Sequence, residues 1–523
     1  MCSCSEPATT QCHHHEPLLP KKCPEPQGDG GGGVAAEAAS IVRLAAPMVG
    51  AGLLMYLRSL VSMLFLGRLG RLPLAGGSLA LGFANITGYS VLSGLAAGMD
   101  PVCGQAFGAG RPSVLAAALR RTVALLLAAS VPVALLWVAM RRVLVAAGQD
   151  PEVAAAAHEF ILFSLPDLAV QSFLHPLRVY LRAQSVTLPL TCAAAAALLL
   201  HVPINVFLVR TLQLGIRGVA IGAVWTNVNF LLFLVAYVVS FSPSSGELSF
   251  HGNDKAIDDD EEEEMEVEWG RLVRLSVQSC VSVCLEWWWY EIMVLLCGVL
   301  ADPKAAVAAM GVLIQTTSLL YIFPHALSCA VSTRVGHELG AGRPAGARRA
   351  ARVGLALGAG LGVAACAWAA AAARGKWARA FTADAGVLRL AAAALPVLGA
   401  AELGNCPQTA GGGVLRGSAR PGTAARVNAA AFYGVGMPAA LALAFWPGRM
   451  DFAGMWVGML AAQLVCAGLM LRAVLRTDWE EQAARARELT GAVDDDDDLK
   501  SAAGHADEDK VKAGNGMLVV TVC

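Results

Sequence analysis

Twelve stretches of this chain are apolar over about 20 residues, the length that a helix needs to cross the hydrocarbon of a bilayer. The mean hydropathy is +0.56, and 56% of the residues are hydrophobic whereas 15% are charged. A soluble domain of 523 residues does not bury that much apolar surface, so the composition predicts a multi-pass membrane protein. Apolar and polar residues do not alternate along the stretches, which argues against β-barrel strands. The expected spans are residues 45–67, 76–98, 122–140, 153–173, 188–209, 215–241, 272–300, 304–330, 350–373, 386–410, 423–446 and 452–474.

The chain also carries the same short motif twice. Gly-Ala-Gly-Arg-Pro occupies residues 108–112 and again 340–344, and Leu-Arg-Ala at 181–183 is echoed by Leu-Arg-Gly at 415–417. The expected spans divide into two sets of six, and because six is an even number both sets enter the bilayer from the same side. The sequence therefore predicts an all-α integral membrane fold, with twelve transmembrane helices in two parallel six-helix lobes around a central cleft. Such clefts carry solutes.

The polar segments define the expected domain limits. These are a disordered N-terminal tail (1–40), a first lobe (41–241), an acidic linker (242–270), a second lobe (271–475) and a C-terminal tail (476–523). Runs of like charge repel themselves and stay solvated, although a regulatory contact is an open alternative. Lys and Arg are more frequent on the side of the tails, so we expect both termini and the linker in the cytosol. No sorting signal chooses among plasma, vacuolar and Golgi or endosomal membranes.

The sequence lacks the motifs of ATP-driven pumps and of enzymes. There is no phosphate-binding GxxxxGK[ST] loop, and no nucleophile–base or metal constellation in the spans, so we expect neither an enzyme nor a cofactor. The net charge is −1, which gives no reason to expect a nucleic-acid partner. We expect the N-terminal tail to be disordered and to hold no metal. A site for a soft metal, formed by its Cys and His residues, is the alternative. The residues in question are Cys2, Cys4, Cys12, His13, His14, His15 and Cys23.

Carboxylates within expected spans are candidates for function, because a charge in the hydrocarbon costs about 2.5–3.5 kcal/mol. The seventh span contains Glu286 and Glu291, which point about 140° apart on a helix, so we expect one at the cavity and the other at a buried polar partner. In the tenth span Glu402 and Asn405 share a face. A carboxyl group removed from water binds a proton more readily, which proton coupling requires. A structural acid, hydrogen-bonded to a neighbouring helix, is the alternative at each position.

Other polar and aromatic side chains in the spans allow two interpretations each. Trp287–Trp289 either stack on a planar or cationic solute or pack and anchor the helix at the membrane surface. We expect Glu159 and Asp167 near the ends of the fourth span, where water reaches them. His201 and His325 are expected to be hydrogen-bonded packing residues. The candidates for lining the substrate cleft are Asn405, Gln408, Trp287, Trp288, Tyr290 and Gln171.

Several motifs resemble one transporter family. Residues 99–109 (MDPVCGQAFGA) resemble the segment after the second span of MATE transporters, the multidrug and toxic compound extrusion family. Residues 284–288 (CLEWW) and 332–342 (STRVGHELGAG) are similar to the plant branch, as are 176–178 (PLR) and 183–185 (AQS). The similarity covers the chain apart from its tails and linker. It implies a twelve-helix, two-lobe antiporter that expels organic solutes and is usually driven by protons in plants.

The resemblance also implies which residues couple transport to protons. It implicates Glu286 and Glu291, which would face an acid of the tenth span across the C-terminal lobe. Many plant members have Asp where this chain has Asn405, so Glu402 on the same face is the candidate for that acid. Prokaryotic members carry an acid in the first span, where the charged residue of this chain is Arg58. We therefore expect no proton coupling through the N-terminal lobe.

Together these features predict a secondary active transporter that exports or sequesters organic solutes by proton-coupled antiport with alternating access. The expected partners are an organic small molecule, protons as the coupling ion and the lipid bilayer, and the chain is expected to act as a monomer. Sodium in place of protons is an open alternative. Two other functions also stay open: a membrane scaffold or receptor that acts through its tails, and a lipid flippase.

Overall fold

The computed structural model describes residues 32–241, 259–374, 377–382, 384–446 and 450–491. Twelve helical segments of this part of the chain are long and apolar enough to cross a membrane, which confirms the twelve predicted spans. The N-terminal cluster of Cys and His lies outside the described residues. The segments are Gly33–Leu69, Arg71–Gly108, Pro112–Val138, Pro151–Ala183, Leu188–Thr211, Gly215–Ser240, Trp269–Cys297, Pro303–Gly340, Pro344–Ala372, Ala385–Gly417, Pro421–Phe445 and Phe452–Leu475.

Short breaks and π-helical turns divide several spans into more than one helix. The first half of the chain forms α1 (Gly32–Leu69), α2 (Arg71–Ala84), η1 (Asn85–Tyr89), α3 (Ser90–Ala96), α4 (Met99–Gly108), α5 (Pro112–Val138), α6 (Met140–Ala146), α7 (Pro151–Ala183), α8 (Leu188–Asn205), η2 (Val206–Thr211) and α9 (Gly215–Phe241). The second half forms α10 (Asp259–Cys297), α11 (Pro303–Gly340), α12 (Pro344–Arg374), η3 (Ala378–Ala380), α13 (Ala385–Gly417), α14 (Pro421–Asn428), η4 (Ala429–Gly436), α15 (Met437–Phe445), α16 (Phe452–Leu475) and α17 (Trp479–Thr490).

Local sequence explains where many of these helices begin. Asp150 caps α7, because its carboxylate accepts the backbone N–H groups of Glu152 and Val153 at 2.9 and 3.2 Å. Both copies of the repeated motif form a corner between two helices. Gly110 and Gly342 adopt the left-handed backbone conformation that ends one helix, with φ of 72° and 66°. The proline two residues later starts the next helix in each copy.

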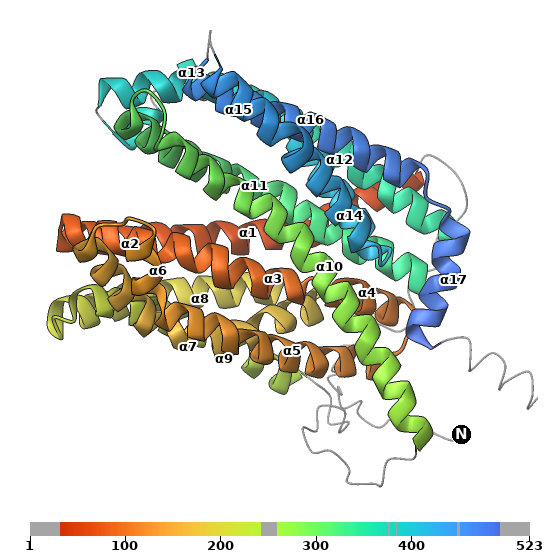
Figure 1. Cartoon of the computed structure of the whole chain (residues 1–523). Coiled ribbons are helices and arrows are strands. Elements are labelled where there is room, and N and C mark those ends of the chain that lie inside the picture. The colour runs from red at the N-terminus through yellow and green to blue at the C-terminus, as the bar shows by residue number, and fades with distance from the viewer. Residues whose placement is uncertain (1–31, 242–258, 375–376, 383, 447–449, 492–523) are drawn as a thin grey trace, which may run out of the picture.

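The helices form two lobes that meet at one end of the molecule and diverge toward the other (Figure 1). Each lobe has its own buried core, one drawn from residues 65–220 and the other from residues 289–470. Helices α1 and α10 contact both halves: α1 packs against α8 and α11, and α10 packs against α3 and α14. The two lobes around a cleft are those that the repeat predicted.

At the closed end, where α17 lies (Figure 1), the two copies of the repeat pack directly against each other. A Cβ atom added to Gly104 of α4 would lie 3.4 Å from the Cα atom of Gly336 in α11. A methyl group on Gly340 would overlap the carbonyl oxygen of Gln105, and one on Gly108 would overlap that of His337. Glycine at these positions therefore lets the two backbones touch.

Hydrogen bonds across the closed end follow the same internal symmetry. Gln105 Nε2 donates to the carbonyl oxygen of Gly417 at 2.9 Å, and His337 Nε2 donates to that of Ala183 at 2.6 Å. Gln105 and His337 occupy equivalent positions of the two repeats, as do Ala183 and Gly417. We call these two bonds and the glycine contacts the latch.

Three helices reach into segments that the sequence assigned to tails or the linker. Helix α1 begins at Gly32, α10 begins at Asp259 within the acidic run, and α17 occupies part of the C-terminal tail. Asp478 caps α17 by accepting two backbone N–H groups, and Ala483 and Ala486 of this helix join a buried cluster. Helix α17 contacts α4 of the first half and α11 and α12 of the second. Its charged surface and short length gave no hydropathy signal.

Candidate functional site

The cleft between the lobes contains two adjacent cavities. The one toward the diverging end has a volume of about 360 Å³, and the one toward the latch has a volume of about 300 Å³. We call them the outer and the inner chamber. Glu286, Trp287 and Tyr321 line both, so the two chambers form one continuous surface for a solute.

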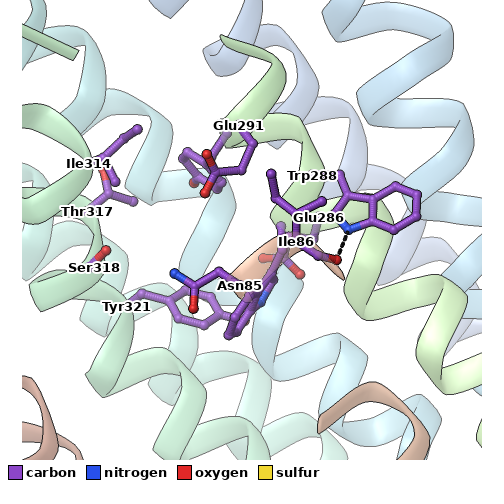
Figure 2. Close-up of a pocket in the computed structure, with 11 residues that line it drawn as sticks. Asn85, Ile86, Glu286, Trp288, Glu291, Ile314, Thr317, Ser318 and Tyr321 are labelled. Carbon is purple, nitrogen blue, oxygen red and sulfur yellow. Dashed lines mark hydrogen bonds between the residues drawn. The ribbon is translucent and has the colours of Figure 1, made fainter. Parts of the chain in front are cut away.

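The outer chamber combines aromatic side chains with two carboxylates. Figure 2 shows α10 contributing Glu286, Trp288 and Glu291 opposite a polar stretch of α11, with η1 at the edge. Trp288 Nε1 donates to the backbone carbonyl of Ile86 at 3.1 Å, which fixes α10 to the N-terminal lobe. The complete lining is Asn85, Ile86, Glu286, Trp287, Trp288, Tyr290, Glu291, Ile314, Thr317, Ser318 and Tyr321.

Both glutamates of the seventh span line this chamber, although they were expected to point apart toward different surroundings. The chamber is wide enough to cover more of the helix surface than a single face. Glu286 Oε1 accepts a hydrogen bond from Gln408 Nε2 at 3.4 Å. Glu291 is half-buried and has neither a hydrogen bond nor an ion pair within the described residues. A solute or water in the chamber therefore has direct access to the Glu291 carboxylate.

A line of hydrogen bonds leads from Glu286 into the interior of the C-terminal lobe. Gln408 Nε2 also donates to Asn405 Oδ1 at 3.3 Å, and Asn405 Nδ2 donates to Glu402 Oε2 at 2.9 Å. Glu402 is 3% exposed and lines neither chamber. We call Glu286, Gln408, Asn405 and Glu402 the C-lobe relay, because it joins a carboxylate in the cavity to one that is buried.

The structure brings most of the predicted cleft residues to the chambers, with two exceptions. Gln408 lines the inner chamber, and Trp287, Trp288 and Tyr290 line the outer one. Asn405 lies behind Gln408, buried against Glu402. Gln171 lies in the N-terminal lobe, where its Nε2 donates to Asp167 Oδ2 at 3.4 Å, and it lines neither chamber. The third tryptophan of the run, Trp289, is buried beside Phe432 and Tyr433.

The prediction for Asp167 was wrong. This residue lies in the middle of α7 and is 3% exposed, because α7 extends ten residues beyond the span expected from hydropathy. Its carboxylate accepts hydrogen bonds from Tyr89 Oη at 2.8 Å and Asn227 Nδ2 at 2.7 Å. Arg58 in turn donates to Asn227 Oδ1 at 3.0 Å. A buried acid with these partners is a second polar centre, and its partners are too distant in sequence to be foreseen.

The remaining titratable candidates fall into three environments. Glu159 pairs with Arg217 on an exposed surface, near water as expected. His201 is fully buried and hydrogen-bonded to Ser62 at 3.1 Å and Thr226 at 2.7 Å, as expected of a packing histidine. His325 is within hydrogen-bond distance of Cys329 Sγ at 3.8 Å and packs against the ring of Tyr321, as expected, and it also lines the inner chamber. Within the described residues no group of three His, Cys, Asp or Glu side chains could hold a metal ion.

The inner chamber is rich in arginine, which the sequence analysis did not foresee. Arg178, Arg182 and Arg416 line it together with Asp100 and Glu286. Arg182 forms an ion pair with Asp100. Arg416 occupies the equivalent position of the second repeat, where Ser332 stands in place of Asp100.

Because its half of the molecule lacks that carboxylate, Arg416 donates to Ser328 Oγ at 2.7 Å and has no ion pair within the described part of the chain. The repeat-related pair of arginines is therefore asymmetric, because Arg182 is neutralised and Arg416 is not. The Leu-Arg echo in the sequence was the signal that could have revealed this pair of arginines.

A helical membrane protein with two repeat-related lobes and a solute-sized cavity between them belongs to the class of transporters. The MatE family model matches residues 47–207 and again 279–441, one match in each half of the chain. Protein DETOXIFICATION 49 of Arabidopsis thaliana is 53% identical over 470 residues, which cover 88% of this chain and 90% of that protein. Protein DETOXIFICATION 51 of the same plant is 52% identical over 472 residues, covering 89% and 85%.

A solved structure agrees with these relatives. The crystal structure of the eukaryotic MATE transporter AtDTX14 superposes with a TM-score of 0.79 at 32% identity, and the match covers 88% of this chain and 100% of that one. The chain therefore belongs to the MATE family of transporters. Membership in this family implies a multi-pass membrane protein with small-molecule substrates, and the relatives are transporters rather than enzymes.

Proposed function

We propose that this protein exports or sequesters organic solutes by proton-coupled antiport, as a monomer with both termini in the cytosol. The solute binds in the two chambers, and the coupling protons bind Glu286, Glu291 and Glu402. The observation that carries the proposal is the C-lobe relay, which connects a carboxylate in the solute cavity to a buried one. Carboxylates are scarce within membrane spans unless they serve such a purpose.

The chemistry of the outer chamber suits an organic solute. Trp287, Trp288 and Tyr321 offer flat aromatic faces for stacking, and Glu286 and Glu291 offer charge or hydrogen-bond acceptors. The inner chamber adds the guanidinium of Arg416. A cavity with apolar walls and a few directed polar groups is typical of small-molecule sites.

The relay gives a physical route from protonation to helix packing. An ionised Glu286 accepts a charge-assisted hydrogen bond from Gln408, and this bond links α10 to α13. Adding a proton removes the charge and weakens the bond, so the two helices repack. Solute and proton then drive exchange because each favours a different arrangement of the helices.

In a cycle of alternating access, the latch would close the cytosolic side of the protein in one of the two states. In the arrangement described here the latch is shut and the lobes diverge on the opposite side (Figure 1). With both termini in the cytosol, the chambers would face the lumen or the cell exterior. Opening the other side requires the lobes, residues 41–241 and 271–475, to separate at the glycine contacts.

The experiment uses proteoliposomes that are acidic inside and two permanently charged probes, ethidium and naphthalene-1-sulfonate. We expect wild-type protein to accumulate at least one probe only when the pH gradient is present, and a sodium gradient of the same size to have no effect. Glu286→Gln, Glu291→Gln and Glu402→Gln should each lower the pH-driven rate by about tenfold or more. Glu159→Gln, which removes a surface carboxylate, is the control. Undiminished pH-driven transport in all three variants would contradict the assignment.

A further inference from the structure

A third cavity lies outside the cleft, at the closed end of the molecule. Its volume is about 510 Å³, and three elements that are distant in sequence surround it: α10, the segment around α14, and α17. We call it the basic pocket. Its lining is Val277, Gln278, Val281, Ala419, Arg420, Gly422, Thr423, Ala425, Arg426 and Arg485.

Positive charge in the basic pocket is only partly neutralised. Of its three arginines, Arg485 forms an ion pair with Glu481 at 2.6 Å. Arg426 donates to Thr423 Oγ1 at 3.3 Å, and Arg420 donates to the hydroxyl of Thr477 at 2.5 Å. Neither of these two has an ion pair within the described residues.

The charge of Arg420 also interacts with that of a second arginine, Arg485. Arg420 lies in the turn between α13 and α14, outside the membrane-spanning segments. Burial and, to a smaller extent, the nearby Arg485 guanidinium lower the pKa of Arg420 below its usual value, and the Glu481 carboxylate offsets part of this effect. Two neighbouring guanidinium groups with too little negative charge between them favour the binding of an anion.

The wall of the pocket on α10 is apolar and faces the surroundings of the molecule. Val277 and Val281 lie one helical turn apart and are 49% and 45% exposed. Both residues belong to the part of α10 that is long and apolar enough to cross a membrane, Trp269–Cys297. An exposed apolar wall on such a helix suits hydrocarbon chains, and the neighbouring arginines suit the charged headgroups of lipids.

We propose that the basic pocket binds the headgroup of an anionic lipid with a terminal phosphate, whose acyl chains lie along Val277 and Val281. Guanidinium groups pair with phosphate oxygens through two parallel hydrogen bonds, and three of them converge here. A soluble phosphate would use the arginines but gain nothing from the apolar wall. Basic pockets between helices at the cytosolic surface are sites where such headgroups bind.

A bound headgroup would connect three elements of the closed end. Arg485 belongs to α17, Arg426 to α14, and the apolar wall to α10. Helix α17 also contacts the N-terminal half, where Arg111 donates to the carbonyl oxygen of Thr490 at 2.9 Å. The lipid would thus hold α17 in place beside the latch.

The test measures binding of dioctanoyl phosphatidic acid to the purified full-length protein in detergent by native mass spectrometry. Dioctanoyl phosphatidylcholine tests the need for a terminal phosphate, and glycerol 3-phosphate tests the need for acyl chains. We expect phosphatidic acid to bind on the order of tenfold more tightly than either compound. Arg426→Gln/Arg485→Gln should weaken its binding by on the order of tenfold or more.

The control removes two exposed arginines at the opposite end of the molecule, Arg141→Gln/Arg142→Gln on α6, and should leave binding unchanged (Figure 1). Unchanged helical content by circular dichroism verifies folding, and the single variant Arg426→Gln serves if the double variant unfolds. Equal affinity of wild-type and variant protein for phosphatidic acid would overturn the proposal. So would equal binding of phosphatidylcholine. Glycerol 3-phosphate binding as tightly as the lipid would assign the pocket to a soluble phosphate instead.

Discussion

At the scale of single residues, the proposed coupling depends most on Gln408. Its amide nitrogen is within hydrogen-bond distance of both Glu286 and Asn405, while the rest of its side chain faces the inner chamber. Hydrogen bonds to charged groups contribute about 1.5–3 kcal/mol, so losing this donor is a tenfold effect or more. A residue with this role should matter for coupling more than for solute affinity.

Replacing Gln408 with methionine keeps the volume and removes the hydrogen bonds. We expect the pH-driven transport rate to fall by about tenfold, while solute exchange without a pH gradient changes less than about twofold. Both rates are measured in the same proteoliposomes. Gln171→Met, the matched change in the N-terminal lobe, is the control. An equal loss of both rates in Gln408→Met would show a structural role only.

Arg416 lines the inner chamber and differs from its repeat equivalent, Arg182, in lacking a carboxylate partner, so its charge is available to a solute. We expect Arg416→Gln to lower naphthalene-1-sulfonate transport by about tenfold relative to ethidium transport, because an anion loses a charged partner whereas a cation loses a repulsion. Arg389→Gln, an exposed position on the same helix, should leave the ratio unchanged. A constant ratio in both variants would exclude contact between Arg416 and either probe.

The repeated Gly-Ala-Gly-Arg-Pro segment is the element that defines the closed end. In each lobe it ends one helix, turns the chain and starts the next, and its glycines and those just before it let α4 and α11 touch. The same residues therefore set both a local corner and a contact between the lobes. At Gly108 and Gly340 a side chain larger than hydrogen has no room.

This close approach predicts a position-specific effect of adding one methyl group. Gly340→Ala would place a Cβ atom against the Gln105 carbonyl and should destabilise the closed end by about 1–3 kcal/mol. A scan of thermal unfolding should show a midpoint lower by a few degrees. Gly360→Ala on α12 has open space around the added atom and should be neutral or slightly stabilising. Equal midpoints for the two variants would mean that the contact is not tight.

The elements differ in how far the sequence predicts them, and the difference has a physical origin. Hydropathy is a local property, so all twelve spans were foreseen, as was the division into two lobes. Partners across the fold are not local: the Tyr89–Asp167–Asn227 contacts join three helices, and the hydropathy of one span says nothing about the next. The packing of α17 was missed for the same reason, since a charged amphipathic helix resembles a solvated tail.

The candidate site shows the same limit. Glu286, Glu291 and Glu402 were identified because a carboxylate within a span is unusual, and this reasoning needs no structure. The order Glu286–Gln408–Asn405–Glu402 needs the packing of α10 against the C-terminal lobe. The arginines of the inner chamber were passed over because each lies near a span end in the sequence, where a cation is ordinary.

At the scale of the whole molecule, two lobes share a latch at one end and a solute cavity in the middle (Figure 1). The cavity and the relay adjoin at Glu286 and Gln408. Antiport requires solute and proton to exclude each other through the state that the lobes adopt. Binding of the solute should therefore release protons from the protein.

The most direct measurement is that release, followed with a pH-sensitive dye when the transported probe, ethidium or naphthalene-1-sulfonate, is added to weakly buffered purified protein. We expect proton release by wild-type protein and by Glu159→Gln, and none by Glu286→Gln/Glu291→Gln/Glu402→Gln that still binds the probe. Binding without release by wild-type protein, or undiminished release by the triple variant, would contradict the proposed coupling.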